Sequence, residues 1–204
     1  MFDNGKGEPA MRKFAVVACM ATVLAGSVGI AEAAQRLAAG GLTSIPYGHM
    51  EFCQRTRGQC GAHRVLPPIA LTQANWKKIE RINRLVNATI KPKSDLEVYG
   101  KRDYWTIPTN GMGDCEDYVL MKRAKLLASG FGASQLLITM VRNRGEAHIV
   151  LTVRTDRGDY VLDNLRDDIR PVEGTGYYYV KMQAPNHSGR WIAISGRAAE
   201  IASN

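Results

Sequence analysis

In the middle of the chain, hydrophobic positions recur at the spacing of amphipathic helices. A first stretch follows Thr72 and ends before Pro92, and its apolar residues fall three or four positions apart, on one helix face. They are Trp76, Ile79, Ile82, Leu85, Val86 and Ile90. A second stretch starts after Asp114, a residue type that often caps a helix start, and runs to Gly130, a type that often follows a helix end. The pattern predicts two helices joined by a long loop, 94–113.

Beyond Gly132 the pattern changes to the alternation that is typical of strands. Clusters of turn residues divide this part of the chain at 143–145, 155–158 and 185–189. The strands are expected at 136–141, 147–154, 159–162, 177–182 and 191–194. Helices followed by a run of turn-separated strands predict an α+β fold, with helices packed on an antiparallel sheet.

The first 33 residues have the pattern of a secretory signal peptide. Arg12 and Lys13 precede an uncharged run from Phe14 to Ile30, and Ala31-Glu32-Ala33 supplies small residues for cleavage. The alternative is a membrane anchor, because the run is close to the minimum of about 17 to 25 residues that spans a bilayer. Its Gly, Ser, Thr and Ala content favours cleavage. We therefore expect a periplasmic or secreted protein without stable membrane insertion.

Residues 34–204 are long enough for one domain with its own core, and no second domain is expected. Its first part, 34–68, is rich in Gly, Pro and polar residues, which predicts an irregular arm. The chain has a formal net charge of +8, but its Lys and Arg residues are scattered among acidic ones. This scatter argues against a nucleic-acid partner and indicates a solvated surface or an aid in meeting acidic partners.

The cysteines point to one unpaired thiol. Cys19 belongs to the predicted signal peptide, and Cys53 and Cys60 lie close together in a polar loop, where they can pair in an oxidising compartment. That leaves Cys115. A free thiol in an exported protein is either buried and inert or chemically used, so the surroundings of Cys115 decide between these.

Cys115 falls in the first turn of the second predicted helix. Unpaired backbone N–H groups and the helix dipole favour a thiolate there, so we expect the pKa of Cys115 to be lowered. Its own N–H would point at the oxygen of an attacked carbonyl and form half of an oxyanion hole. Trp105 and Asn110, in the preceding loop, are candidates for the other half.

A histidine and an aspartate are expected to meet on the predicted sheet. If strands 147–154 and 159–162 form a hairpin, Val150 faces Asp163, and His148 lies diagonal to Asp163 on the same face. Diagonal neighbours are roughly 7 to 8 Å apart, which is within reach of an imidazole-to-carboxylate hydrogen bond. A register slip of one residue would put the two side chains on opposite faces.

Cys115, His148 and Asp163 would supply a nucleophile, a base and a carboxylate that orients the base. The alternative is that each is structural: a small buried residue, a strand histidine and a turn aspartate. A zinc site is a further alternative, but the spacing matches no common ligand pattern. The three together with an unpaired exported thiol favour acyl chemistry.

Several segments carry a family resemblance: Tyr104 to Pro108, Gly113 to Tyr118, His148 to Leu151, Val161 to Leu165, and upstream Glu51-Phe52-Cys53 with Cys60. Together they resemble the bacterial transglutaminase-like cysteine proteinases, over about residues 45 to 195. The resemblance implies a papain-like core with a Cys-His-Asp triad at Cys115, His148 and Asp163. The best-known members are periplasmic proteases that release a biofilm adhesin by cutting near an Ala-Ala pair.

The same resemblance implies a calcium site. In the adhesin-processing branch, acidic residues flanking the cysteine bind calcium, and Asp114 and Glu116 occupy those positions. There is also a physical reason for a cation, because Asp114, Glu116 and Asp117 surround the thiol with like charge, which raises its pKa. An oxygen-liganded Ca²⁺ would offset this. The alternative is that Asp114 and Asp117 cap the helix while Glu116 is solvated.

These observations predict an exported cysteine-type endopeptidase that hydrolyses a protein substrate, at the cell surface or in the periplasm. One alternative is transglutaminase-type acyl transfer, which uses the same triad and an amine in place of water. Another is a non-catalytic binding module of the same fold, against which the intact Cys115, His148 and Asp163 argue. The identities of the substrate and of any regulatory protein do not follow from the sequence.

Overall fold

The computed structural model describes residues 35–195, together with Met1, Phe2 and Gly5. The predicted signal peptide, 1–33, therefore lies almost wholly outside the described residues, as does its membrane-anchor alternative. Among the residues that are described, no helix combines the length and the apolar character needed to cross a membrane.

Helices come mainly first in the chain and strands mainly last. The helices are α1 (Tyr47–Arg55), α2 (Gln73–Thr89), α3 (Asp95–Tyr99) and α4 (Cys115–Ala128), with single 3₁₀ turns at Arg57–Gln59, Ala133–Gln135 and Val172–Gly174. The strands are β1 (Ala38–Thr43), β2 (Lys91–Pro92), β3 (Met112–Gly113), β4 (Leu136–Asn143), β5 (Glu146–Thr155), β6 (Gly158–Leu162), β7 (Arg170–Pro171), β8 (Tyr178–Ala184) and β9 (His187–Ser195).

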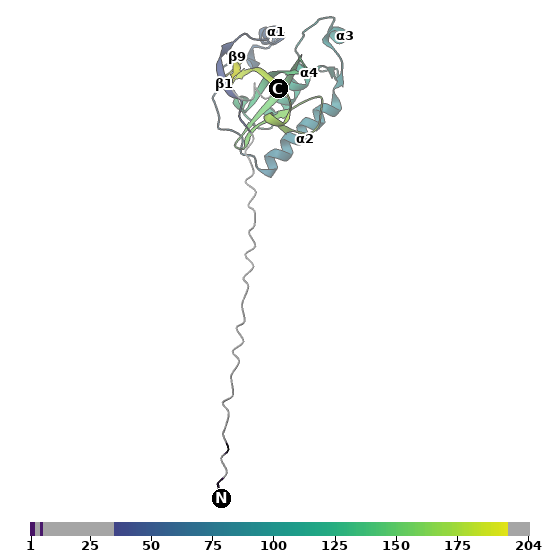
Figure 1. Ribbon diagram of the computed structural model, residues 1–204. Helices are drawn as coiled ribbons and strands as arrows, with labels where there is room; N and C mark the ends of the chain where they lie inside the picture. The colour runs from purple at the N-terminus through teal and green to yellow at the C-terminus, as the bar shows by residue number, and fades with distance from the viewer. Residues whose placement is uncertain (3–4, 6–34, 196–204) are drawn as a thin grey trace. The chain divides into compact units, whose positions relative to one another are not determined.

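Seven strands form one antiparallel sheet in the order β1-β9-β8-β4-β5-β6-β7. The two short strands β2 and β3 pair separately and in parallel. Helix α4 packs against β5 and against α2, so the two long helices lie together over the sheet (Figure 1). The predicted α+β fold, with helices on an antiparallel sheet, is confirmed.

The predicted amphipathic helices form as expected. The Thr72 side chain accepts a hydrogen bond from the backbone N–H of Asn75 and so caps α2. The buried face of α2 includes Ile79, Ile82 and Val86, which join the main core with residues of α4 and the inner face of β5. A second core, which contains Val150 and Val161, fills the other face of the sheet. Burial on both faces explains why the strands are apolar at odd and even positions alike.

Two expectations about loops are wrong. The segment 34–68 is not an irregular arm throughout, because it contains the edge strand β1 and the helix α1. The segment 94–113 is not a plain loop, because Ser94 and Glu97 form a capping box that starts α3. All three elements are short, and β1 is exposed along most of its length, so none of them shows a clear hydrophobic period.

Candidate active site

Cys115 is the first residue of α4 and is partly buried. The residue before the N-cap must be small, because a Cβ atom on Gly113 would clash with the carboxylate of Asp117. Asp114 occupies the N-cap position, as expected, but its side chain does not cap the helix. Its Oδ2 instead accepts a hydrogen bond of 3.4 Å from the backbone N–H of Asp95. One oxygen of this carboxylate thus binds the start of α3 instead of the N–H groups of α4.

The expected pairing of His148 with Asp163 is present. Strands β5 and β6 pair with Leu151 opposite Leu162, which is the register that puts both side chains on one face. Nε2 of His148 and Oδ1 of Asp163 are 2.9 Å apart. The residues are 7% and 2% exposed, so the bond is shielded from water. Since Nε2 faces Asp163, Nδ1 is the ring nitrogen left for another partner.

Tyr177 completes this pair and was not expected from the sequence. Its hydroxyl donates a hydrogen bond to Oδ2 of Asp163, and its ring meets the His148 ring edge-on at 5.8 Å between centroids. Burial raises the pKa of Asp163, but the hydrogen bonds from His148 and Tyr177 outweigh burial and hold that pKa at about 2. Asp163 is therefore a fixed carboxylate at neutral pH.

The thiol of Cys115 lies beside the same part of the sheet. Helix α4 packs on β5, and the backbone of Ile149, the residue after His148, contacts the thiol and favours its ionised form. The nucleophile candidate and the base candidate thus come from two packed elements. The three candidate residues are brought to one end of the interface between α4 and β5.

The expectation of a lowered thiol pKa is wrong. Burial and the neighbouring Glu116 raise the pKa of Cys115 well above its usual range. The sulfur donates a hydrogen bond of 3.1 Å to Oε2 of Glu116. The helix dipole, which contributes up to about 2 kcal/mol in a partly buried position, does not outweigh these two effects.

The structure adds two acidic residues to those predicted around the thiol. Carboxylate oxygens of Asp95, Asp103 and Glu116 lie within 4.8 Å of one another, which is close enough for one ion to bind all three. Oxygens of Asp95, Asp114 and Asp117 lie equally close together. Among the described residues, one oxygen each of Asp95, Asp114 and Asp117 is buried without a hydrogen-bond partner. This cluster of five carboxylates, from α3, the loop after it and the start of α4, is called the acidic cluster below.

Burial disfavours charge throughout the acidic cluster. It raises the pKa of Glu116 to about 9 and that of Asp117 to about 8, and the charge of Asp114 adds to both shifts. Hydrogen bonds hold part of the cluster in place, since Thr106 donates its backbone N–H to Asp117 and Tyr104 donates its own to Asp95. Preplaced oxygens that lack partners are the ligands that a hard divalent cation prefers.

Of the two candidates for the second oxyanion donor, the structure excludes the indole of Trp105 and leaves Asn110 untested. Trp105 is buried, and its indole N–H donates to Oδ1 of Asp103 at 2.8 Å, so it is not available for this role. The side-chain oxygen of Asn110 accepts a hydrogen bond from the backbone N–H of Met112, and the same side chain hydrogen-bonds the hydroxyl of Tyr99. The role of Asn110 as the second oxyanion donor stays a prediction.

The expected disulfide is present between Cys53 in α1 and Cys60. It ties α1 to the 3₁₀ turn that follows, and both sulfurs pack against the main core. Cys115 is the free cysteine of the described residues. The separation of one free thiol from one structural pair is thus as predicted.

Known proteins resemble this chain in sequence and in fold. The family model for the bacterial transglutaminase-like cysteine proteinases, BTLCP, matches residues 39–199. Among solved structures, Legionella pneumophila LapG is 27% identical over 58% of this chain and 68% of its own, with a TM-score of 0.50. A search of curated proteins finds no significant match.

Two further LapG structures differ in calcium: one is calcium-bound and the other was treated with the chelator EGTA. Calcium-bound L. pneumophila LapG is 25% identical and covers 63% of this chain and 74% of its own, with a TM-score of 0.50. EGTA-treated LapG is 27% identical and covers 58% and 67%, with the same TM-score.

Proposed function

The chain belongs to the bacterial transglutaminase-like cysteine proteinases, and on that premise we propose that it is an endopeptidase with Cys115 as nucleophile, His148 as base and Asp163 as the residue that orients the base. The observation that carries this proposal is the buried hydrogen bond between His148 and Asp163, placed beside the helix that begins at Cys115. The family match covers all three residues.

The proposed reaction follows from the hydrogen bond that His148 makes with Asp163. Nε2 of His148 is held by Asp163, so Nδ1 takes the proton from the thiol of Cys115. The thiolate attacks the peptide carbonyl, and the backbone N–H of Cys115 stabilises the oxyanion from the helix start. His148 then returns its proton to the leaving amine, and water resolves the thioester. Asp163 stays ionised throughout, which fixes the histidine tautomer.

The acidic cluster fits a calcium ion, and calcium-bound LapG supports the same assignment here. Asp114 and Glu116 are the proposed ligands, with Asp95, Asp103 and Asp117 around them. Bound Ca²⁺ would supply positive charge next to the thiol. The acidic cluster holds buried carboxylate oxygens that have no hydrogen-bond partner. Burying such oxygens costs free energy unless a cation binds them.

Calcium binding is tested by its effect on both stability and thiol reactivity. We expect calcium to raise the Tm, and a chelator to lower the Tm and to slow alkylation of Cys115 by iodoacetamide at neutral pH. Asp114→Asn should reduce the response to calcium without removing a helix cap, because this side chain does not cap α4. Glu80→Gln, which replaces a partly exposed acidic residue of α2 outside the acidic cluster, is the matched control and should respond as the wild type does.

If the chelator changes neither the Tm nor the alkylation rate, the cluster does not bind calcium. The endopeptidase proposal would survive that result, because it rests on the triad.

The proposed compartment is the periplasm or the exterior, and the proposed substrate is an envelope or surface protein. The Cys53–Cys60 disulfide supports an oxidising compartment, where such bonds persist. Edman or mass-spectrometric detection of new N-termini in a substrate would support hydrolysis. Incorporation of a fluorescent amine into an acceptor protein, without new N-termini, would show acyl transfer instead.

A further inference from the structure

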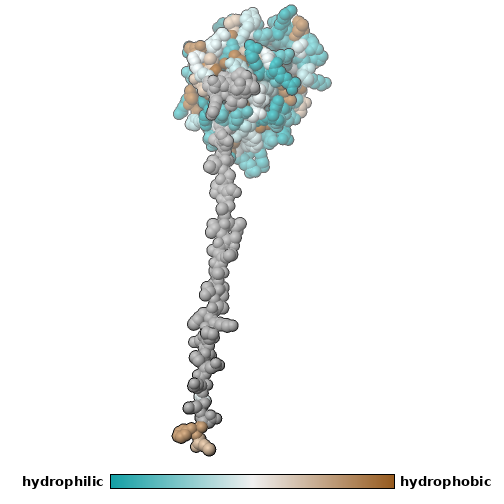
Figure 2. Space-filling view, viewed as in Figure 1, coloured by the Kyte–Doolittle hydropathy of each residue, from teal (hydrophilic) through white to brown (hydrophobic). Residues whose placement is uncertain are grey.

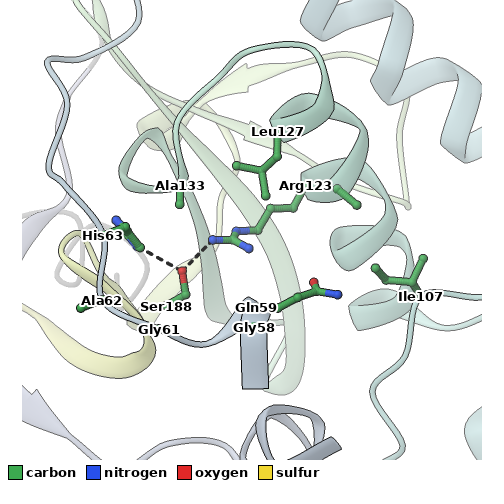
Figure 3. A pocket seen from close by; sticks show the side chains of 11 residues that line it. Gly58, Gln59, Gly61, Ala62, His63, Ile107, Arg123, Leu127, Ala133 and Ser188 are labelled. Atoms are coloured by element: carbon green, nitrogen blue, oxygen red, sulfur yellow. Dashed lines mark hydrogen bonds between the residues drawn. The ribbon is translucent and has the colours of Figure 1, made fainter. Parts of the chain in front are cut away.

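A cavity lies away from the acidic cluster, where the C-terminal half of α4 faces the end of the disulfide loop and the segment that follows it. It has a volume of about 380 Å³, and Arg123 and Leu127 of α4, Gln59, His63 and Ser188 are among the residues that line it. Arg123 lies about 12 Å along the helix from Cys115, at 1.5 Å per residue. Figure 3 shows the Arg123 side chain reaching across the cavity toward Ser188.

Arg123 is a buried cation without a carboxylate partner. It is 4% exposed, and no acidic residue among those described lies within ion-pair distance of it. Burial lowers its pKa to about 10, so it is still charged at neutral pH. A buried charge without a counter-charge is expensive, and a guanidinium cannot escape the cost by losing its proton. Water can solvate this charge, but only a bound anion can neutralise it.

The guanidinium is fixed in one orientation. Nε donates to the backbone oxygen of Leu136 at 3.0 Å, and Nη2 donates to the hydroxyl of Ser188 at 2.8 Å. Ser188 is held in turn by Nε2 of His63 at 3.1 Å. Among the described residues Nη1 has no acceptor, so the outer edge of the guanidinium remains available to a ligand. Gln59 and Ile107 lie across the cavity from this edge (Figure 3).

We propose that this cavity, the Arg123 pocket, binds a small oxyanion, either a peptide carboxylate or a free phosphate. The paired N–H groups of a guanidinium match the two oxygens of such a group, and the shielded position strengthens the bonds. The amide of Gln59 supplies a further donor at the cavity mouth. None of the residues that line the pocket is acidic. The site is separate from the proposed catalytic residues and needs none of them.

The test measures the Tm while chloride is replaced by acetate or phosphate at constant ionic strength, without added calcium. We expect a saturable rise in Tm, because a ligand that binds only the folded state stabilises it. Ala124→Leu places a larger side chain in the cavity without changing any charge and should abolish the rise. Arg84→Met removes one exposed arginine on α2 and should leave the rise intact.

A second variant tests the pocket even if Ala124→Leu fails to fold. Gln59 is exposed, so Gln59→Ala should fold normally and weaken oxyanion binding by about tenfold, the usual effect of one hydrogen bond to a charged group. Comparison of N-acetyl-dialanine with its C-terminal amide separates the sources. Binding of the acid form alone identifies a peptide carboxylate, and binding of phosphate alone identifies a free anion.

Either of those results supports the pocket. The proposal is overturned if the wild type shows no saturable response to acetate, phosphate or N-acetyl-dialanine. It is also overturned if the response is equal in wild type, Ala124→Leu and Gln59→Ala, since that would be a general salt effect.

Discussion

At the scale of single residues, the sequence predicts the site well where a local rule is sufficient. The strand register follows from the position of the hairpin turn, and it correctly brings His148 to Asp163. Tyr177 could not be predicted in the same way. It contacts Asp163 from the far side of a loop, and no period or spacing relates residue 177 to residue 163.

Tyr177 gives the first prediction at this scale. Tyr177→Phe removes the hydroxyl that donates to Asp163 and leaves the ring against His148. We expect kcat to fall by about tenfold, the equivalent of one hydrogen bond to a charged group. Tyr178→Phe is the matched control, because its side chain is partly exposed on the neighbouring position of β8. Equal activity of both variants in a peptide-cleavage assay would refute a positioning role for Tyr177.

The same carboxylate gives a second prediction. Asp163→Asn keeps the shape of the side chain but removes the negative charge that selects the histidine tautomer. Loss of the orienting carboxylate costs a factor of about 10⁴ in kcat in comparable triads, and we expect a loss between that value and about 10². The measurement is kcat for a cleaved peptide, with the Tm as a check on folding. A variant with wild-type kcat would rule out the proposed role.

The thiol shows where a local rule misleads. A helix start predicts a lowered pKa for Cys115, yet burial and Glu116 raise it. The burial of Glu116 depends on how α3 and its following loop close over the start of α4, which is a tertiary feature. Asp114 and Glu116 can be predicted as part of the cluster because they flank Cys115 in the sequence. Asp95 and Asp103 are distant in the sequence, and they reach the cluster only when α3 and the loop after it pack on α4.

At the scale of elements, long periodic segments are predictable and short ones are not. Helix α2 and strands β4, β5 and β6 have lengths and periods that the sequence shows directly. Strand β1 is an exposed edge of Ala, Gly, Leu and Thr, and it pairs only because β9 offers a partner. Helix α3 is a single capped turn or so, too short for a hydrophobic period to appear.

The disulfide gives a prediction at this scale. Replacing Cys53 and Cys60 together by Ser releases α1 from the 3₁₀ turn after it. A loop this short restricts the unfolded chain only slightly, so the free energy of unfolding should fall by about 2 kcal/mol. Urea unfolding of the double variant measures this. A double variant as stable as the wild type would show that packing alone holds the segment.

At the scale of the whole molecule, one face of residues 35–195 shows no large hydrophobic patch (Figure 2). On the face in Figure 2, hydrophobic residues of the described chain are dispersed among hydrophilic ones. The interior instead contains isolated polar groups at the junctions between elements. One of these is His49, which is buried where α1 meets β9.

His49 predicts how stability depends on pH. Burial, with a smaller contribution from Arg123, lowers its pKa to about 4, and Nδ1 accepts a hydrogen bond from the indole of Trp191 at 3.1 Å. The unfolded chain therefore binds a proton more readily than the folded one between about pH 6.5 and 4. The free energy of unfolding should decrease as the pH falls through this window, by at most about 3 kcal/mol.

Urea unfolding at several pH values checks this, with His49→Gln as the comparison. Glutamine can still accept from Trp191 but does not titrate, so the variant should show a flatter pH profile. Identical profiles for the two proteins would mean that His49 is not the group responsible.

The central claim is that Cys115 cleaves peptide bonds, and one measurement tests it most directly. An extract of envelope proteins is incubated with the chain lacking residues 1–33, and new N-termini are identified by mass spectrometry for wild type, Cys115→Ser and Arg84→Met. The account predicts the same new N-termini with wild type and Arg84→Met, and none with Cys115→Ser at an unchanged Tm. New N-termini that persist with Cys115→Ser, or that are absent with folded, calcium-supplied wild type, would contradict it.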